Sequence, residues 1–247
     1  MRHIVATLLA PPLSTLVLGP VLLLQGRHVR KVTPKLPEPP GERSGITGSG
    51  PELRLLILGD SAAAGVGAPH QRDALLGQLV NALAKDFCVH WTLHACTGHT
   101  TQQALAHLAQ LPPQPFDMVV TSIGVNDATA GTATKRWRQH MMELLHTLEE
   151  RHEAGHILVS GLPPMHRFPA LPQPLRWYMG MRAAALNRAL QQLLADNPRR
   201  QLVEVAFSDD AGLMASDGFH PGPGAYAEWG RIVAGIVRER LEEQLQH

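Results

Sequence analysis

Residues 53–67 read LRLLILGDSAAAGVG, and this stretch decides how the chain is organised. The apolar run from Leu53 to Leu58 ends abruptly in Gly59-Asp60-Ser61, and three alanines and two glycines follow before the next helical pattern. Such a run is typical of a buried strand that delivers a serine to a turn. The position of Ser61 suits a nucleophile, a phosphate-binding loop or a simple helix cap, and the rest of the chain has to distinguish these three readings.

After residue 52 the sequence alternates short apolar runs with helical patterns. The runs predict five strands, at Leu53 to Leu58, Val89 to Ala95, Asp117 to Ile123, His156 to Ser160 and Leu202 to Val205. Helices are expected between them, at about 73–85, 101–110, 134–152, 175–196 and 223–244. This alternation predicts an α/β domain with a parallel sheet that is covered on both faces.

Length and charge narrow the functional classes. After about fifty atypical residues, the rest of the 247-residue chain suffices for one domain with a large core. The formal net charge is +1 and only 17% of the residues are charged, which gives no electrostatic reason to expect nucleic acid as a partner.

The N-terminal segment predicts contact with a membrane. Residues 4–24 carry no charge over a length that can cross a bilayer core, and no Ala-x-Ala cleavage site or lipid-attachment cysteine follows them. An uncleaved anchor or signal is therefore expected at 1–26, a basic and then Pro/Gly-rich linker at 27–51, and the folded domain at 52–247. Four basic residues between 27 and 35 favour a cytoplasmic domain, with secretory export as the alternative.

Polar motifs follow the predicted strands where a parallel sheet places a site. Gly59-Asp60-Ser61 follows the first strand, Gly98 the second, and Gly124-Val125-Asn126-Asp127 the third, while Asp217-Gly218-Phe219-His220 precedes the last helix. A serine hydrolase needs a nucleophile, a base, a group that orients the base and donors for an oxyanion. Ser61, His220 and Asp217 can fill the first three roles, and the amides of Ser61 and Gly98 with the Asn126 side chain can fill the fourth.

These four blocks, GDSAAAG at 59–65, Gly98, GVND at 124–127 and DGFHPG at 217–222, resemble those of the SGNH/GDSL hydrolase superfamily. The resemblance implies a flavodoxin-like three-layer αβα sandwich with a five-stranded parallel sheet. It also implies a catalytic Ser61, Asp217 and His220, an oxyanion hole of Ser61, Gly98 and Asn126, and no metal or organic cofactor. Alanines at 62–64 depart from the bulky residue that often follows the family's serine.

Each of these residues also has a less specific interpretation. A lone serine after a strand is usually a helix cap, and Asn126 or Gly98 alone would be ordinary turn residues. Asp60 and Asp127 are expected to hold the turns that carry Ser61 and Asn126. His90, His94 and His99 do not predict a metal site, because His90 and His94 on one strand lie about 13 Å apart.

The substrate is less constrained than the chemistry. The loop at 162–177 holds five prolines, and Met165, Phe168, Leu171 and Trp177 are expected either to form a wall of an acyl pocket or to pack the loop onto the domain. With the predicted anchor, this favours lipid-like acyl esters or thioesters. A carbohydrate or peptidoglycan O-acetyl esterase and an inactive, membrane-tethered binding module are the alternatives. The sequence gives no indication of oligomeric state.

Overall fold

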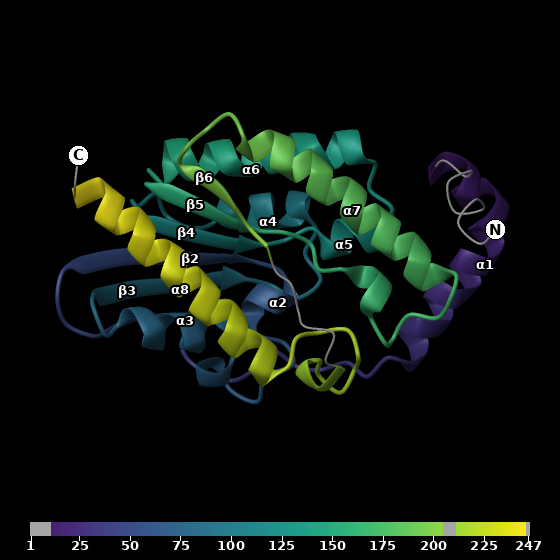
Figure 1. Cartoon of the computed structure of the whole chain (residues 1–247), viewed down its shortest axis with the longest axis horizontal. Coiled ribbons are helices and arrows are strands. Elements are labelled where there is room, and N and C mark those ends of the chain that lie inside the picture. The colour runs from purple at the N-terminus through teal and green to yellow at the C-terminus, as the bar shows by residue number, and fades with distance from the viewer. Residues whose placement is uncertain (1–10, 205–210, 246–247) are drawn as a thin grey trace, which may run out of the picture.

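The computed structural model describes residues 11–204 and 211–245, and its centre is one mixed sheet (Figure 1). Six strands lie in the order β1-β3-β2-β4-β5-β6. Their bounds are β1 Ser44–Thr47, β2 Glu52–Gly59, β3 Cys88–Ala95, β4 Met118–Ser122, β5 His156–Ser160 and β6 Arg200–Val203. The five predicted strands are present and mutually parallel, although the end predicted for the last of them, Val205, lies outside the described residues.

Helices connect the strands much as the periodicity predicts. The α-helices are α1 Pro11–Val32, α2 Ser61–Ala64, α3 Leu75–Leu83, α4 Thr101–Leu108, α5 Val125–Ala130, α6 Thr134–Arg151, α7 Leu175–Leu194 and α8 Pro223–Leu245. Single 3-10 turns occur at η1 Gln71–Asp73, η2 Met165–Arg167 and η3 Ala211–Leu213.

The helices form a layer on each face of the sheet, because the strand side chains alternate between two apolar cores. Leu53, Leu55 and Ile57 of β2 pack with α3 and α8, whereas Leu56 and Leu58 face α4, α6 and α7. All five of these side chains are almost fully buried. A strand that is buried on both faces reads as a continuous apolar run, which is why β2 was recognisable in the sequence.

The predicted count of five strands is wrong, because β1 adds a sixth. Residues 44–47 fall in the segment 27–51 that was expected to be a solvated linker, and they instead pair antiparallel with β3. Trp91 of β3 donates a hydrogen bond from Nε1 to Oγ1 of Thr47 at 3.1 Å. The strand escaped prediction because Ser44-Gly45-Ile46-Thr47 is only four residues long and its side chains are exposed or half-buried at the sheet edge.

Helix α1 also runs past the expected anchor boundary at residue 26. Its Leu22 is 8% exposed and belongs to the core beside α7. Gln25 binds both sides of the turn that begins α7, donating to the Gln173 carbonyl oxygen at 2.7 Å and accepting from the Leu175 amide at 3.1 Å. Residues 1–10 of the predicted anchor lie outside the described residues, and none of the described helices meets the length and hydropathy needed to span a bilayer.

The order of the parallel strands determines where a site can form. Apart from β1, the sheet runs second-first-third-fourth-fifth in chain order, so β2 lies where the connections diverge to β3 on one side and β4 on the other. In doubly wound sheets, ligands bind outside the carboxyl ends of the strands at this switch point. Ser61 follows the carboxyl end of β2, at the switch point.

Candidate active site

The turn after β2 holds Ser61 in a fixed position. Asp60 is the N-cap of the short helix α2, and its Oδ1 accepts a hydrogen bond from the Ala62 amide at 3.1 Å. Gly59 precedes it with φ +159°, and a Cβ at this position would lie 2.0 Å from the carbonyl oxygen of Ser122 in β4. Only glycine therefore allows β2 and β4 to come this close immediately before the serine.

Ser61, His220 and Asp217 form a continuous hydrogen-bonded chain. Oγ of Ser61 lies 2.9 Å from Nε2 of His220, and Nδ1 of His220 lies 2.5 Å from Oδ2 of Asp217. When Nδ1 carries the imidazole proton and donates a hydrogen bond to the carboxylate, Nε2 is free to accept a hydrogen bond from the serine hydroxyl. The structure thus brings together three residues that are separated by up to 159 positions in the sequence.

The surroundings of Asp217 keep it ionised. Burial by itself would raise its pKa, but hydrogen bonds from the His220 ring and from the Phe219 and His220 amides outweigh burial and hold the pKa below its ordinary value. Both amides lie 3.0 Å from Oδ1, so Oδ2 is available to the imidazole. The side chain of Asp217 is 1% exposed and that of His220 is 18% exposed.

Asp60 has the opposite electrostatic character. Its side chain lies in the interior, and desolvation raises the pKa of this carboxyl to about 7 despite the hydrogen bond from Ala62 and the nearby His220. It contacts neither the serine hydroxyl nor the imidazole through a hydrogen bond. Asp60 therefore caps the helix that begins with Ser61, which is consistent with the expectation that it holds this turn.

Two loops converge beside Ser61 with backbone and side-chain donors. Gly98 has φ +85° and lies in an exposed loop after β3, and Asn126 lies in the first turn of α5. Nδ2 of Asn126 donates to the carbonyl oxygen of His99 at 2.9 Å and makes a long contact of 3.4 Å with Oδ2 of Asp60. Among the described residues, no hydrogen-bond acceptor is assigned to the amides of Ser61 and Gly98. Asn126 therefore ties the Gly98 loop to the serine turn.

Asp127 connects the same two loops through buried hydrogen bonds. Oδ2 accepts from both the amide and the hydroxyl of Thr101, at 2.8 and 2.9 Å, and Nε1 of Trp137 donates to that hydroxyl at 3.1 Å. Asp127 and Thr101 are 1% and 0% exposed. Burial raises the pKa of Asp127 above its ordinary value, in opposition to the two bonds from Thr101. This network joins α5 to the start of α4, on either side of the Gly98 loop.

The Gly98 loop is also held from the N-terminal side. Oε1 of Glu38 accepts from the Thr97 amide at 2.8 Å and from the Thr97 hydroxyl at 2.7 Å. Oε2 of the same carboxylate pairs with Arg43 at 2.9 Å. Residues before β1 thus contribute directly to the position of Gly98, which the linker prediction did not anticipate.

A small apolar cavity of about 40 Å³ opens beside Ser61. The predicted wall contributes one residue to it, Phe168. Met165 and Leu171 are buried in the core between the sheet and α7, and Trp177 lies on α7 outside the cavity lining. The lining residues that the sequence analysis missed are Ser122, Val125, Gly161, Pro163, Phe219, Pro221 and Trp229. Val125, Phe219 and Pro221 had a usable signal, because they adjoin Asn126 or His220 in the sequence. The ring of Phe219 lies 5.1 Å from that of Phe168.

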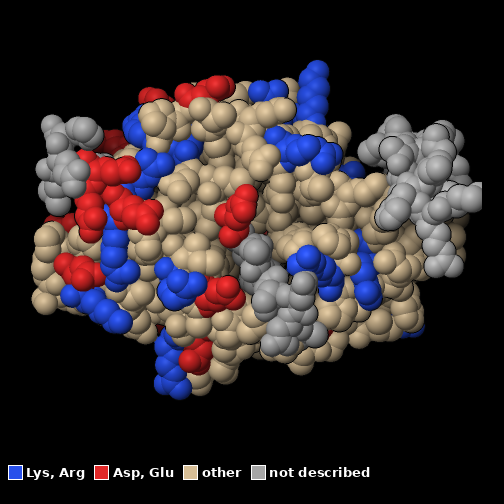
Figure 2. All heavy atoms as spheres, in the orientation of Figure 1, with Lys and Arg blue, Asp and Glu red and all other residues tan. Residues whose placement is uncertain are grey.

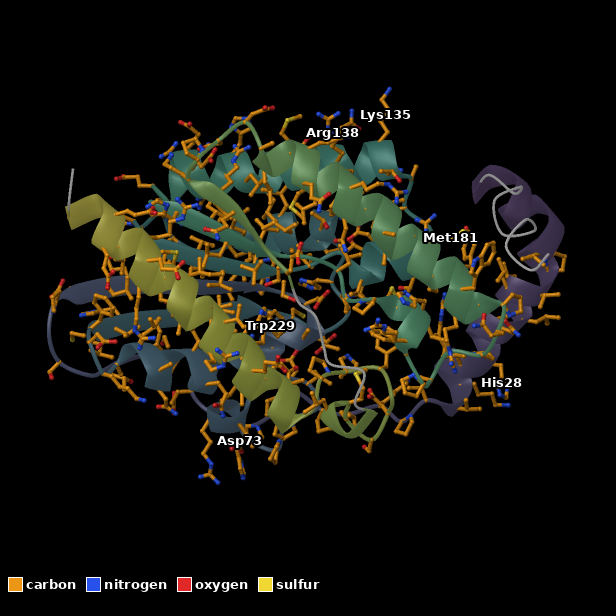
Figure 3. All side chains as sticks on the ribbon, in the orientation of Figure 1. His28, Asp73, Lys135, Arg138, Met181 and Trp229 are labelled. Carbon is orange, nitrogen blue, oxygen red and sulfur yellow. The ribbon has the colours of Figure 1, made fainter. Side chains whose placement is uncertain are left out.

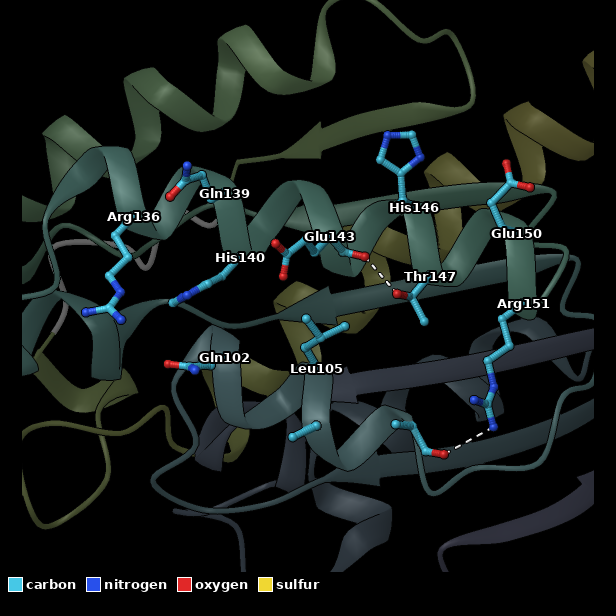
Figure 4. Close-up of a pocket in the computed structure, with 12 residues that line it drawn as sticks. Gln102, Leu105, Arg136, Gln139, His140, Glu143, His146, Thr147, Glu150 and Arg151 are labelled. Carbon is cyan, nitrogen blue, oxygen red and sulfur yellow. Dashed lines mark hydrogen bonds between the residues drawn. The ribbon is translucent and has the colours of Figure 1, made fainter.

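A much larger hollow lies away from this chemistry. An open groove of about 950 Å³ lies between α4 and α6. Figure 4 shows Gln102 and Leu105 on one wall and Arg136, Glu143 and Arg151 on the other. The groove contains none of the residues that converge on Ser61. Its size reflects an open surface between two helices, so the small cavity at the carboxyl ends of the strands is the better candidate for a reaction site.

The histidines considered as metal ligands contact other groups. His90 lies near Cys88 and Glu52, while His94 stacks on His107 with ring centroids 3.9 Å apart, and His99 meets the edge of His107. Within residues 11–204 and 211–245, no group of three or more His, Cys, Asp or Glu side chains is arranged to hold a metal ion.

Comparison with known sequences agrees with the geometry. The profile of the GDSL-like Lipase/Acylhydrolase family matches residues 57–228, which span the Ser61 turn and both convergent loops through to α8. No curated protein matches the chain.

Solved structures of low sequence identity share the fold. A carbohydrate esterase family 2 enzyme from Corynascus thermopiles (Myceliophthora fergusii) is 14% identical with a TM-score of 0.60, over 79% of this chain and 68% of that one. Est24, a carbohydrate acetylesterase from Sinorhizobium meliloti, is 18% identical with a TM-score of 0.56, over 76% and 99%. An extracellular lipase from Streptomyces rimosus is 18% identical with a TM-score of 0.55, over 74% and 99%.

Proposed function

The chain belongs to the GDSL-like lipase/acylhydrolase family of ester hydrolases, and on this basis we propose that it hydrolyses esters of short carboxylic acids through an acyl-enzyme on Ser61. The observation that carries the proposal is the chain of hydrogen bonds from Ser61 through His220 to Asp217, with a small apolar cavity beside the serine hydroxyl.

In the proposed reaction, His220 Nε2 takes the proton of Ser61 as Oγ attacks the ester carbonyl carbon. Asp217 stabilises the imidazolium and fixes which nitrogen carries the proton. The same proton then passes to the leaving alcohol as the carbon–oxygen bond breaks, which leaves Ser61 acylated. A water molecule then removes the acyl group by the same steps. It gives a proton to His220 and attacks the acyl carbon, and His220 returns the proton to Oγ of Ser61 as the acid leaves.

The carbonyl oxygen gains negative charge in each tetrahedral intermediate, and three donors are available for it. We assign this role to the amides of Ser61 and Gly98 and to Nδ2 of Asn126. The side-chain amide nitrogen of Asn126 carries two protons: one is donated to the His99 carbonyl oxygen, while the other makes only the long contact with Asp60. Donors fixed in this way stabilise charge without having to reorganise during the reaction.

The cavity favours a small acyl group. A water molecule requires about 10–15 Å³ of such volume, so about 40 Å³ holds only a few heavy atoms. Phe168, Phe219 and Val125 line the cavity and limit its extension. This favours the O-acetyl esterase alternative over the long lipid-like chains expected from the sequence. Two solved structures of the same fold are named as carbohydrate esterases and a third as a lipase, so a carbohydrate ester is proposed by analogy with the first two.

The test is the hydrolysis of p-nitrophenyl esters from acetyl to palmitoyl by the full-length protein. We expect a maximum of kcat/KM at acetyl or propionyl, loss of turnover in Ser61→Ala, and no change in Ser44→Ala, which alters an exposed serine of β1. Phe168→Ala should move the maximum to longer chains because it removes the ring that limits the cavity. A maximum at long chains in the wild type would refute the short-acyl assignment, and no turnover of any ester by folded protein would favour the inactive binding module.

A further inference from the structure

Helix α1 is held against the domain, yet it exposes large apolar side chains. Val21, Leu23 and Leu24 are 44%, 58% and 66% exposed, whereas Leu22 on the opposite side is buried against the core near α7. Gln25 fixes the helix through its two hydrogen bonds at the start of α7. The outward apolar face is therefore held in a defined orientation relative to the domain.

A set of cations follows these apolar residues within two helical turns. Arg27, Arg30 and Lys31 are exposed, and the first acidic residue in the whole sequence is Glu38. Within the described part of the chain, no ion pair is formed by any of these three cations. Figure 2 shows the same asymmetry: the half of this face toward α1 carries Lys and Arg with almost no Asp or Glu, while acidic side chains gather toward the opposite end.

A cavity of about 450 Å³ lies beneath this part of α1, between it, α5 and α7. Its cationic lining residues are Arg27, Arg30 and Arg182, and its apolar ones include Leu22, Leu23 and Met179. Arg182 is held in place by donating to the carbonyl oxygens of Ala128 and Thr132. A phosphate group that carries an alkyl chain matches both parts of this lining.

We propose that α1 docks the protein on a bilayer that contains anionic phospholipids, with Leu23 and Leu24 at the acyl boundary and Arg27, Arg30 and Lys31 at the level of the phosphates. Interfacial helices bind by this combination of buried apolar area and attraction to anionic lipids. Because α5 lines the cavity and also carries Asn126, the docked surface lies at the end of the sheet that carries Ser61, as the position of α1 in Figure 1 shows. The proposal concerns binding and does not depend on the proposed ester hydrolysis.

The experiment is co-sedimentation of the full-length protein with two kinds of vesicle: phosphatidylcholine alone, and phosphatidylcholine with about one third phosphatidylglycerol. Each cation near an anionic surface contributes about fivefold to affinity, so the triple variant Arg27→Gln/Arg30→Gln/Lys31→Gln should bind the anionic vesicles about 100-fold more weakly. Leu23→Ser/Leu24→Ser should weaken binding to them as well.

A matched control removes the same charge elsewhere. Lys135, Arg136 and Arg138 are exposed on α6, where Figure 3 shows Lys135 and Arg138 projecting away from the domain and far from His28 of α1. Substitution of these three residues by Gln should leave vesicle binding within about twofold of the wild type. The proposal is overturned if neutral and anionic vesicles bind equally, if neither binds, or if the two triple variants lose affinity to the same extent. Circular dichroism establishes that each variant is folded.

Discussion

Replacement of Asp60 by Asn tests the electrostatic description of the serine turn. Asp60 is 2% exposed, and burial raises the pKa of its carboxyl from an ordinary 3.8 to about 7. Between these two pH values the folded protein retains a proton that the unfolded chain has released. The stability associated with this proton is complete below about pH 4 and is lost progressively as the pH rises to 7.

The expected magnitude follows from that shift. About three pH units at 1.36 kcal/mol each correspond to about 4 kcal/mol of unfolding free energy that the wild type loses over this range. Asp60→Asn has nearly the same size and keeps an oxygen for the Ala62 amide, but it does not titrate. The free energy of unfolding of the variant relative to the wild type should therefore increase by about 4 kcal/mol between pH 4 and pH 8.

Urea denaturation of both proteins at intervals across this pH range measures the difference. Asp196→Asn serves as the control, because Asp196 is exposed after α7, and its unfolding free energy should follow that of the wild type at every pH. If the difference in unfolding free energy between Asp60→Asn and the wild type stays constant within about 1 kcal/mol from pH 4 to pH 8, the pKa of the Asp60 carboxyl is not raised by burial.

Substitutions at three further residues test the site. Asp217→Asn should lower kcat for p-nitrophenyl acetate by about 10⁴-fold without unfolding the protein, because the amide no longer fixes the imidazole tautomer; a loss below tenfold would contradict the orienting role. Asp127→Ala should lower the free energy of unfolding, measured by urea denaturation, by about 2–5 kcal/mol, because the buried amide and hydroxyl of Thr101 lose their acceptor. Asp127→Asn retains an oxygen and should lower it by about 1 kcal/mol; equal losses in the two variants would argue against the network. Gly59→Ala should lower the Tm by more than about 5 °C, because its Cβ would meet the Ser122 carbonyl oxygen, and an unchanged Tm would show that β2 and β4 can separate freely.

The parallel sheet and the convergence of Ser61, His220 and Asp217 could be predicted because their signals are local. Leu53–Leu58 is apolar on both strand faces, so its burial is visible without knowledge of its neighbours. Asp217 and His220 are three residues apart in one turn, and the topology rule alone places them at the same sheet edge as Ser61. The interpretation of Asp127 as a support for its loop is consistent with its two bonds to Thr101.

The walls of the cavity were not predictable in the same way, because they come from segments that are distant in the sequence. The fold brings Val125, Pro163, Phe219 and Trp229 together around the cavity. Pro163 and Trp229 have no predicted site residue beside them in the sequence. For Met165 the sequence left open a place in the cavity wall or packing of the loop onto the domain, and the 3-10 turn η2 buries it in the core, where it is 0% exposed. The side of a loop that faces a cavity depends on tertiary packing that composition does not encode.

The short strand β1 protects the molecule from self-association. Its pairing covers the outer edge of β3, which would otherwise offer a row of free backbone donors and acceptors to the same edge of another copy. Polar Ser44 and Thr47, together with its length of four residues, make β1 itself a poor template for further pairing. A chain shortened to begin at the predicted boundary, residue 52, would expose the edge of β3 from Val89 to Thr92 that β1 covers, and we expect it to aggregate where the full chain stays dispersed.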